Sequence, residues 1–226
     1  MKKVILFLVC APLVFGCSSW SNLTNGTLIG SGAGAALGAG IGYLVGKDGK
    51  GAAIGAAIGT AVGGGTGAII GHKMDKKAEE LAALQNAEVE TVEDVNGLTA
   101  IKVTFNGGIL FDTNKSDLKA SAKAELKEFA QMMADMPDTD ITIYGHTDNT
   151  GTYEVNQKVS NNRANSVEKY LESLGIDKAR MNAEGLSYDF PVADNATAEG
   201  RQQNRRVEIY ISANQAMVDA AAAQAN

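Results

Sequence analysis

Few of the residue types on which catalysis, metal binding and nucleic-acid binding depend are present in this chain. It holds two cysteines and two histidines among 226 residues. His72 has no second ligand at metal-binding spacing and His146-x-Asp148 has no third, so no metal site is predicted. Ser160 and Ser166 lack a nucleophile-elbow motif, and no constellation of a nucleophile or acid pair is present. The net charge is −6 without a basic run, which excludes a nucleic-acid surface. We therefore expect neither an enzyme nor a cofactor.

The first residues have the pattern of an export signal. Lys2 and Lys3 precede an apolar run over 4–15, which is too short to span a bilayer. The sequence Leu-Val-Phe-Gly-Cys that ends at Cys17 resembles a bacterial lipobox, which implies a signal peptide over 1–16, lipidation of Cys17 and a lipidated tether over 17–25. By resemblance to lipoprotein sorting, Ser18 implies the outer membrane. An ordinary cleaved signal that leaves Cys17 as a free thiol is the alternative.

Glycine recurs at every fourth residue in two uncharged series that flank the polar turn 47–50. The series comprise Gly26, Gly30, Gly34, Gly38, Gly42 and Gly46, and then Gly51, Gly55, Gly59, Gly63, Gly67 and Gly71. Each such glycine costs a helix in water ~1 kcal/mol relative to alanine, whereas in lipid a glycine ridge lets two helices approach closely. Each arm is ~30 Å long as a helix, which matches the hydrocarbon core of a bilayer. Residues 26–71 therefore predict a helical hairpin, and they resemble the glycine-zipper region of some outer-membrane lipoproteins. A self-associating Gly/Ala spacer and an oligomeric glycine-zipper assembly are the alternatives.

Two further segments flank the expected core and predict a linker before it and a tail after it. Residues 72–94 are charged and rich in alanine, and they predict a linker with a helical spacer in which Leu81 and Leu84 are the large apolar anchors. The tail 213–226 is also alanine-rich and predicts a short helix or disorder. The packed core is expected mainly from 95–212.

Hydrophobic periodicity within the core segment predicts an α+β domain. A hairpin over 88–105 turns at Asn96-Gly97, and strands are expected around Ile141 and Ile143, near 181–186 and over 207–211. Helices are expected from Leu118 to Met136 and from Val155 to Leu174. The order β-α-β-α-β(-β) predicts two helices packed on one face of a mixed sheet.

A cation and an anion meet where the second of these helices begins. Arg163 falls on the apolar stripe between Val159 and Val167, where a guanidinium requires a partner. Asp148 lies fifteen residues upstream, in the loop that leads into the same helix. Either the pair forms a structural salt bridge, or the two residues bind a zwitterionic ligand and pair with each other only when it is absent.

Three groups of residues together resemble the OmpA-like peptidoglycan-binding domain. They are the sequence GHTDNTG at 145–151, the pattern Asn156-x-x-Val159-Ser160-x-x-Arg163-Ala164-x-x-Val167-x-x-x-Leu171, and Gly200-Arg201 with Asn204-Arg205-Arg206-Val207-Glu208. The match covers roughly 100–212, and Val159 departs from the leucine usual there. With the features in front, the chain resembles a glycine-zipper OmpA-family outer-membrane lipoprotein, related to the peptidoglycan-associated lipoproteins.

The resemblance implies a ligand and the roles of two site residues, to which the neighbouring residues add further expectations. The ligand is the diaminopimelate of the peptidoglycan stem peptide, whose ammonium is taken by Asp148 and whose carboxylate is taken by Arg163. Thr147, Asn149 and the amides near Gly151 add hydrogen bonds at the start of the helix. Asn156 and Ser160 are expected to hold Arg163 in place. One of Arg205 and Arg206 is expected to border the groove, and we choose Arg205. His146 is expected either to be structural or to line the groove.

The expected function is non-catalytic tethering of the outer membrane to the cell wall. The alternative is a membrane-inserting or oligomerising lipoprotein in which 26–71 forms a pore or an assembly platform, and a homo-oligomer is compatible with either function. A wall hydrolase is disfavoured because the required constellation is absent.

Overall fold

The computed structural model describes residues 64–94, 96–112 and 115–225. The predicted signal peptide, Cys17, the tether and all of the predicted glycine hairpin before Gly64 lie outside these residues. None of the described helices is long and apolar enough to cross a membrane.

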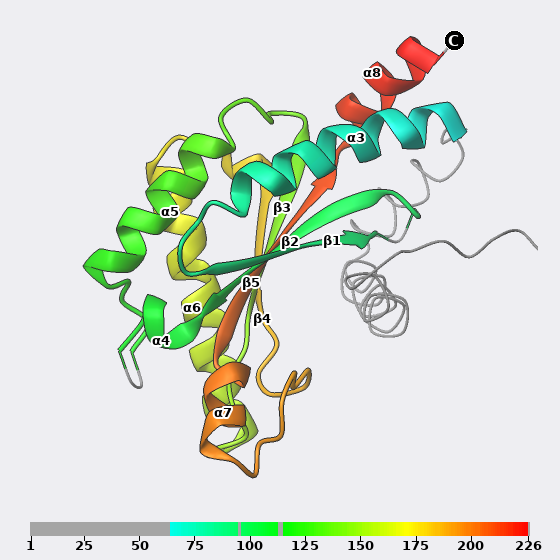
Figure 1. Ribbon diagram of the computed structural model, residues 1–226. Coiled ribbons are helices and arrows are strands. Elements are labelled where there is room, and N and C mark those ends of the chain that lie inside the picture. Colours follow the sequence, from blue (N-terminus) through cyan, green and yellow to red (C-terminus); the bar gives the residue numbers. More distant parts are fainter. Residues whose placement is uncertain (1–63, 95, 113–114, 226) are drawn as a thin grey trace, which may run out of the picture.

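One mixed five-stranded sheet organises the domain (Figure 1). Its strands in chain order are β1 (Ala87–Glu93), β2 (Thr99–Asn106), β3 (Thr139–Gly145), β4 (Met181–Gly185) and β5 (Arg206–Ala213). They lie side by side in the order β1-β2-β5-β3-β4, in which β3 and β4 are parallel and the other neighbours are antiparallel. The helices are α3 (Gly64–Leu81), α4 (Gly107–Leu110), α5 (Ala120–Met132), α6 (Tyr153–Ser173), α7 (Ala198–Asn204) and α8 (Gln215–Ala225), with a 3-10 turn η1 (Lys178–Arg180).

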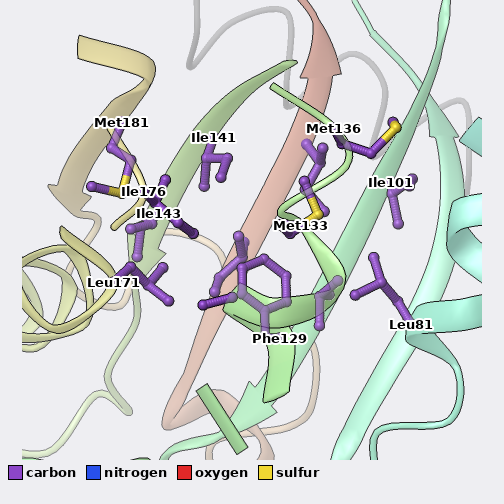
Figure 2. Close-up of a cluster of buried hydrophobic side chains, with 14 of the residues drawn as sticks. Leu81, Ile101, Phe129, Met133, Met136, Ile141, Ile143, Leu171, Ile176 and Met181 are labelled. Carbon is purple, nitrogen blue, oxygen red and sulfur yellow. The ribbon is translucent and has the colours of Figure 1, made fainter. Parts of the chain in front are cut away.

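The core lies between one face of the sheet and the helices. Alternate residues of β2, β3 and β5 point into it, as the period of two in a strand requires. Figure 2 shows Ile101 and Ile143 of the sheet with Phe129 of α5 and Leu171 of α6 in this cluster. The prediction of two helices on a mixed α+β sheet is confirmed. The predicted hairpin over 88–105 is also present, and Gly97 has the positive φ of 71° that its turn requires.

The predicted charged linker, 72–94, is instead part of the folded domain. Helix α3 buries Ile70, Met74 and Leu81 completely in the core. Lys77, although charged, is 4% exposed, and its ammonium contacts Asp135, in the turn after α5, at 2.7 Å. β1 pairs with β2 along its whole length. The domain therefore includes α3 and begins before residue 95. Apolar residues spaced along a charged helix fit both a solvent-exposed spacer and a packed helix, so the sequence pattern did not distinguish the two.

The last residues also belong to the domain. Residues Gln215–Ala225 form α8, in which Met217, Val218 and Ala221 are buried. Because α8 lies along α3 (Figure 1), these two helices cover each other. Of the two predictions for the tail, the short helix is correct.

Candidate functional site

Three chain segments meet at the end of the sheet where β3 and β4 terminate and β5 begins. They are the loop 146–152, the residues 107–112 and 115–119 that follow β2, and the junction between α7 and β5. Two glycines permit the close approach. A Cβ on Gly145 would overlap the Ser160 carbonyl of α6, and one on Gly107 would lie 2.5 Å from the Arg205 carbonyl oxygen. The Gly107 amide donates to that same oxygen at 2.7 Å. The sequence thereby fixes α6 and α4 against the strands that carry the site.

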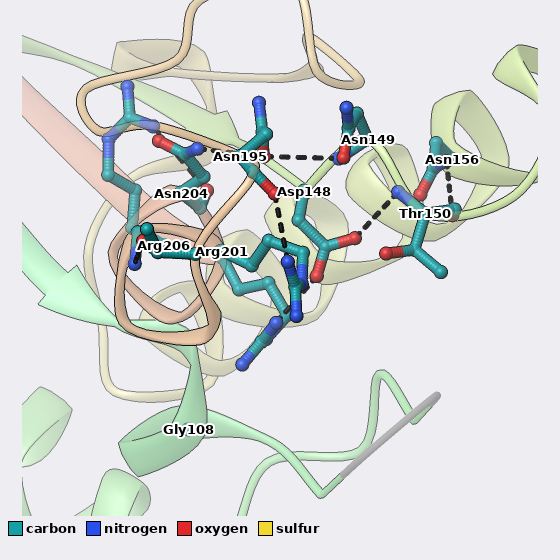
Figure 3. A network of polar contacts seen from close by, with 12 residues as sticks. Gly108, Asp148, Asn149, Thr150, Asn156, Asn195, Arg201, Asn204 and Arg206 are labelled. Atoms are coloured by element: carbon teal, nitrogen blue, oxygen red, sulfur yellow. Dashed lines mark hydrogen bonds and ion pairs between the residues drawn. The ribbon is translucent and has the colours of Figure 1, made fainter.

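Asp148 lies in the loop after β3 and is 8% exposed (Figure 3). Its Oδ2 contacts Arg205 Nη1 at 2.5 Å, and its Oδ1 accepts from the Thr150 amide at 2.8 Å. Burial alone raises the pKa of Asp148, but the hydrogen bonds from Arg205 and Thr150 outweigh it and hold the pKa below its ordinary value. Asp148 is therefore an anion at neutral pH, and its partner is the Arg205 predicted to border the site.

Arg163 is 5% exposed on α6, and it does not pair with Asp148 as the sequence predicted for the unliganded protein. Its Nε donates to the Lys115 carbonyl oxygen at 3.2 Å, and its guanidinium carbon lies 5.2 Å from the centre of the Phe111 ring. The predicted pair is wrong, because Asp148 pairs with the more exposed Arg205 instead.

The terminal nitrogens of Arg163 are available for a ligand. Within the described residues, neither of its two Nη atoms makes a hydrogen bond. Burial lowers the pKa of Arg163, the nearby Arg205 lowers it further, and Asp148 raises it. The guanidinium stays charged at neutral pH because its ordinary pKa is far above 7. A planar fork with unused donors, on a side chain that is otherwise buried, is suited to bind a carboxylate.

Asn156 and Ser160 have different partners from those predicted. The Asn156 amide donates to the carbonyl oxygens of Thr150 at 2.9 Å and Thr152 at 3.1 Å. Ser160 Oγ donates to the Gln157 carbonyl oxygen and accepts from the Ser187 amide. The expectation that they hold Arg163 is therefore wrong, because both side chains bond to backbone groups. Asn156 instead holds the loop that contains Asp148.

The other predicted residues of this loop lie around Asp148. Gly151 is exposed with φ 95°, a conformation that favours glycine. The Asn149 amide lies 3.3 Å from Asn195 Oδ1. The Thr147 amide donates to the Ser187 carbonyl, and its buried hydroxyl has no hydrogen-bond partner within the described residues. The loop therefore contributes backbone amides and one unused hydroxyl close to the anion.

Several residues that support the site were not found by sequence reasoning. The Asn204 side chain accepts from the amides of Val192 and Ala193 and donates to Asn195 Oδ1 at 2.9 Å (Figure 3). Phe111 and the Lys115 carbonyl define the position of Arg163. An aromatic residue at the end of the short apolar run Ile109-Leu110-Phe111 was the available signal for Phe111. No sequence signal indicated the carbonyl, because a backbone contact depends only on the fold.

His146 and Arg206 belong to a separate buried cluster. His146 Nε2 lies 3.4 Å from Glu208 Oε2 without the geometry of a hydrogen bond, and Arg206 Nε donates to Glu208 Oε1 at 2.7 Å. Burial lowers the pKa of His146, although the neighbouring Glu208 opposes the shift. Tyr210 completes the cluster by donating to Glu208 at 2.9 Å. Of the two neighbouring arginines, Arg205 lies at the candidate site and Arg206 is buried. Within the described part of the chain no group of three metal-ligating side chains occurs.

Comparison with known sequences gives two family matches. Residues 110–205 match the OmpA family, and 1–75 match the YMGG-like Gly-zipper. A probable lipoprotein of Escherichia coli, YiaD, is 38% identical over 94% of this chain and 99% of its own length. The outer-membrane lipoprotein YfiB of Pseudomonas aeruginosa is 32% identical over 60% of this chain and 78% of its length. Outer membrane porin F of the same species is 44% identical, but the chain spans only 35% of that porin.

Solved structures share the fold. The cell wall anchor of the T6SS from Pseudomonas aeruginosa is 30% identical with a TM-score of 0.53, covering 62% of this chain and 97% of that one. A MotB-like protein from Desulfovibrio vulgaris has a TM-score of 0.56 at 23% identity, covering 66% and 99%. The second likeness concerns the fold alone.

Proposed function

The chain belongs to the OmpA family of outer-membrane proteins and lipoproteins, and from this we propose that it binds peptidoglycan without catalysis and tethers the outer membrane to the wall. The relation to a cell wall anchor at 30% identity supports this role. The domain lies on the periplasmic side, where the wall is. We propose diaminopimelate of the stem peptide as the group recognised.

One observation carries the choice of diaminopimelate. The guanidinium of Arg163 is buried with both terminal nitrogens free of hydrogen bonds within the described residues. A buried arginine whose terminal nitrogens have no protein partner favours a ligand that accepts hydrogen bonds from both of them. Diaminopimelate offers a carboxylate and an ammonium on one carbon, and its carboxylate matches the planar fork of an arginine.

Asp148 supplies the complementary charge for the ammonium. In the unliganded protein its Oδ2 is occupied by Arg205, a side chain that is 40% exposed. Because Asp148 is buried, its charge needs a partner, and a ligand ammonium can take the place of Arg205, whose more exposed side chain can then turn to solvent. Arg205 then borders the groove, and Thr147, Asn149 and the backbone near Gly151 supply further hydrogen bonds.

The N-terminal segments complete the proposed tether. A lipid on Cys17 would anchor the chain in the outer membrane, and 17–25 would connect it to the glycine segment. The YMGG-like Gly-zipper match over 1–75 supports an interaction of this segment with lipid or with other copies. This match also favours the second candidate function, an oligomeric assembly platform, which deletion of 27–63 would test through the size of the purified protein.

Sedimentation with purified cell walls tests the main proposal. The full chain is expected to cosediment with diaminopimelate-type walls, and Asp148→Ala and Arg163→Ala are each expected to remove this binding. Lys169→Ala, which changes an exposed residue later on α6, is the matched control and should bind normally. Circular dichroism and thermal unfolding establish that each variant is folded. Normal binding by both folded site variants would refute the proposal.

A further inference from the structure

We infer that one face of α6 is a second subsite, which binds an N-acetylated sugar of the glycan strand. The inference rests on the proposed function, because this strand carries the stem peptide. A hollow of about 510 Å³ lies on this face, lined by Tyr153, Glu154, Gln157, Lys158, Asn161 and Asn162. The row runs along about 13 Å of helix. It begins at the first residue of α6, and Asp148 lies in the loop that leads into this helix.

Two amides in the hollow are held in fixed orientations by a single residue of β4. Gln157 Nε2 donates to the Gly185 carbonyl at 2.5 Å, and Asn161 Oδ1 accepts from the Gly185 amide at 2.6 Å. A backbone N–H can only donate and a carbonyl can only accept, so these bonds determine which way each amide faces. Gly185 permits this contact because any Cβ there would overlap the Asn161 backbone.

Each amide keeps an unused polar atom. Within the described residues, Gln157 Oε1 accepts no hydrogen bond and Asn161 Nδ2 donates none. The two residues are four apart on one face of the helix, so an acceptor and a donor lie next to each other. An acetamido group offers the complementary pair, an N–H and a carbonyl. Side chains already fixed by other bonds lose little entropy when they bind such a group.

An exposed aromatic side chain stands at the end of the row. Tyr153 is 41% exposed, and its hydroxyl donates to Asp189 at 2.8 Å. The ring of Tyr188 meets it edge-on, with centroids 5.5 Å apart and an interplanar angle of 90°. These contacts hold the Tyr153 ring, and an amphipathic ring held in this way suits a surface with both apolar and hydroxyl groups. The C–H face of a pyranose is such a surface.

The charge of the hollow favours an uncharged occupant. Glu154 and Lys158 carry opposite charges, and the other four lining residues are neutral at pH 7. The residue type most suited to a carboxylate, arginine, is absent from the lining. A neutral acetylated sugar therefore fits this face better than a second copy of the charged stem peptide.

Titration of the full chain with two sugar oligomers tests the inference. Chitotriose carries N-acetyl groups but no peptide, and its deacetylated counterpart has the same ring skeleton without them. The protein is kept in a detergent that has no sugar headgroup. We expect chitotriose to bind with chemical-shift changes at Gln157, Asn161 and Asn162, and the deacetylated trimer to bind at least fivefold more weakly. Equal binding of the two trimers, or shifts confined elsewhere, would overturn the inference.

Variants separate this subsite from the stem-peptide subsite. Tyr153→Ala and Gln157→Leu should each weaken chitotriose binding by roughly two- to twelvefold, the range for one net hydrogen bond or ring contact. Lys169→Ala should leave it unchanged. A free diaminopimelate-containing peptide, measured on the same samples, should bind the Tyr153 variant normally. Should the peptide fail to bind the wild type while chitotriose binds, the proposed recognition of the stem peptide is wrong and the sugar site stands. Peptide binding without chitotriose binding would overturn the sugar subsite and leave the stem-peptide site standing. Chemical-shift changes in the hollow caused by the peptide alone would mean that the hollow binds a peptide rather than a sugar.

Discussion

Replacing Arg163 with lysine should separate the shape of the guanidinium from its charge. Lysine keeps the positive charge but has no planar fork, so one of two charge-assisted hydrogen bonds to a ligand carboxylate is lost. Such a bond contributes about 1.5–3 kcal/mol, which corresponds to a loss of affinity of roughly 10- to 150-fold. Isothermal titration with a diaminopimelate-containing peptide measures this loss directly.

The same substitution should also destabilise the fold, which has to be distinguished from lost binding. Arg163→Lys removes the hydrogen bond to the Lys115 carbonyl and the contact with Phe111, and together these account for roughly 1–2.5 kcal/mol of the free energy of unfolding. Arg180→Lys is the matched control. Arg180 also donates to backbone carbonyls, at 2.6 Å to Thr139 and 2.7 Å to Met136, but lies outside the site.

The two variants should therefore lose comparable stability in urea and differ in binding. Arg180→Lys should retain the wild-type affinity, whereas Arg163→Lys should not. If the folded Arg163→Lys protein bound the peptide within threefold of the wild type, the guanidinium fork would not be the recognition element and the reasoning would fail.

Three further predictions concern packing and protonation. Gly185→Ala should lower the free energy of unfolding in urea by roughly 3 kcal/mol, because its Cβ would overlap the backbone of Ser160 and its neighbour; an unchanged midpoint would contradict the close approach. Leu81→Ala should cost about 2–5 kcal/mol in the same assay if α3 belongs to the domain, and under 1 kcal/mol if it were a spacer. Because the pKa of Asp148 is lowered, its charge and the binding that needs it are present above that pKa and are lost as the pH falls through it. Peptide affinity should therefore be constant from pH 7 to 5 and fall only below about pH 4. Arg205→Ala should move this fall to higher pH, and an unmoved profile would exclude the ion pair as its cause.

Local patterns predicted the elements of the fold because their physical causes are local. The period of Ile141 and Ile143 and the Asn96-Gly97 turn each depend on neighbouring residues, and each was correct. The role of α3 was not predicted, because its buried Ile70 lies in a glycine-rich segment and its burial depends on a sheet distant in sequence. Lys77 adds to the difficulty. In the sequence it looks like a solvent-exposed residue, and its burial becomes apparent only from its contact with Asp135 in the folded structure.

The site illustrates the same division. A charge on an apolar stripe correctly indicated that Arg163 is buried. The predicted pairing of Arg163 with Asp148 was wrong. Asp148 pairs with Arg205, and this pairing depends on where the fold places the α7–β5 junction. Asn156 likewise occupies the expected place but bonds to the Thr150 carbonyl. Sequence patterns indicated which residues gather, whereas hydrogen-bond partners followed from the folded geometry.

The most direct test of the proposed recognition compares two stem peptides that differ in one group. A peptide with lysine in place of diaminopimelate lacks only the side-chain carboxylate that Arg163 is proposed to bind. Titration of the wild-type chain should give an affinity for the diaminopimelate peptide at least about tenfold higher than for the lysine peptide, since one charge-assisted interaction is absent. Arg163→Ala should remove that difference. Equal affinities of the wild type for the two peptides would contradict the assignment of Arg163 to the ligand carboxylate.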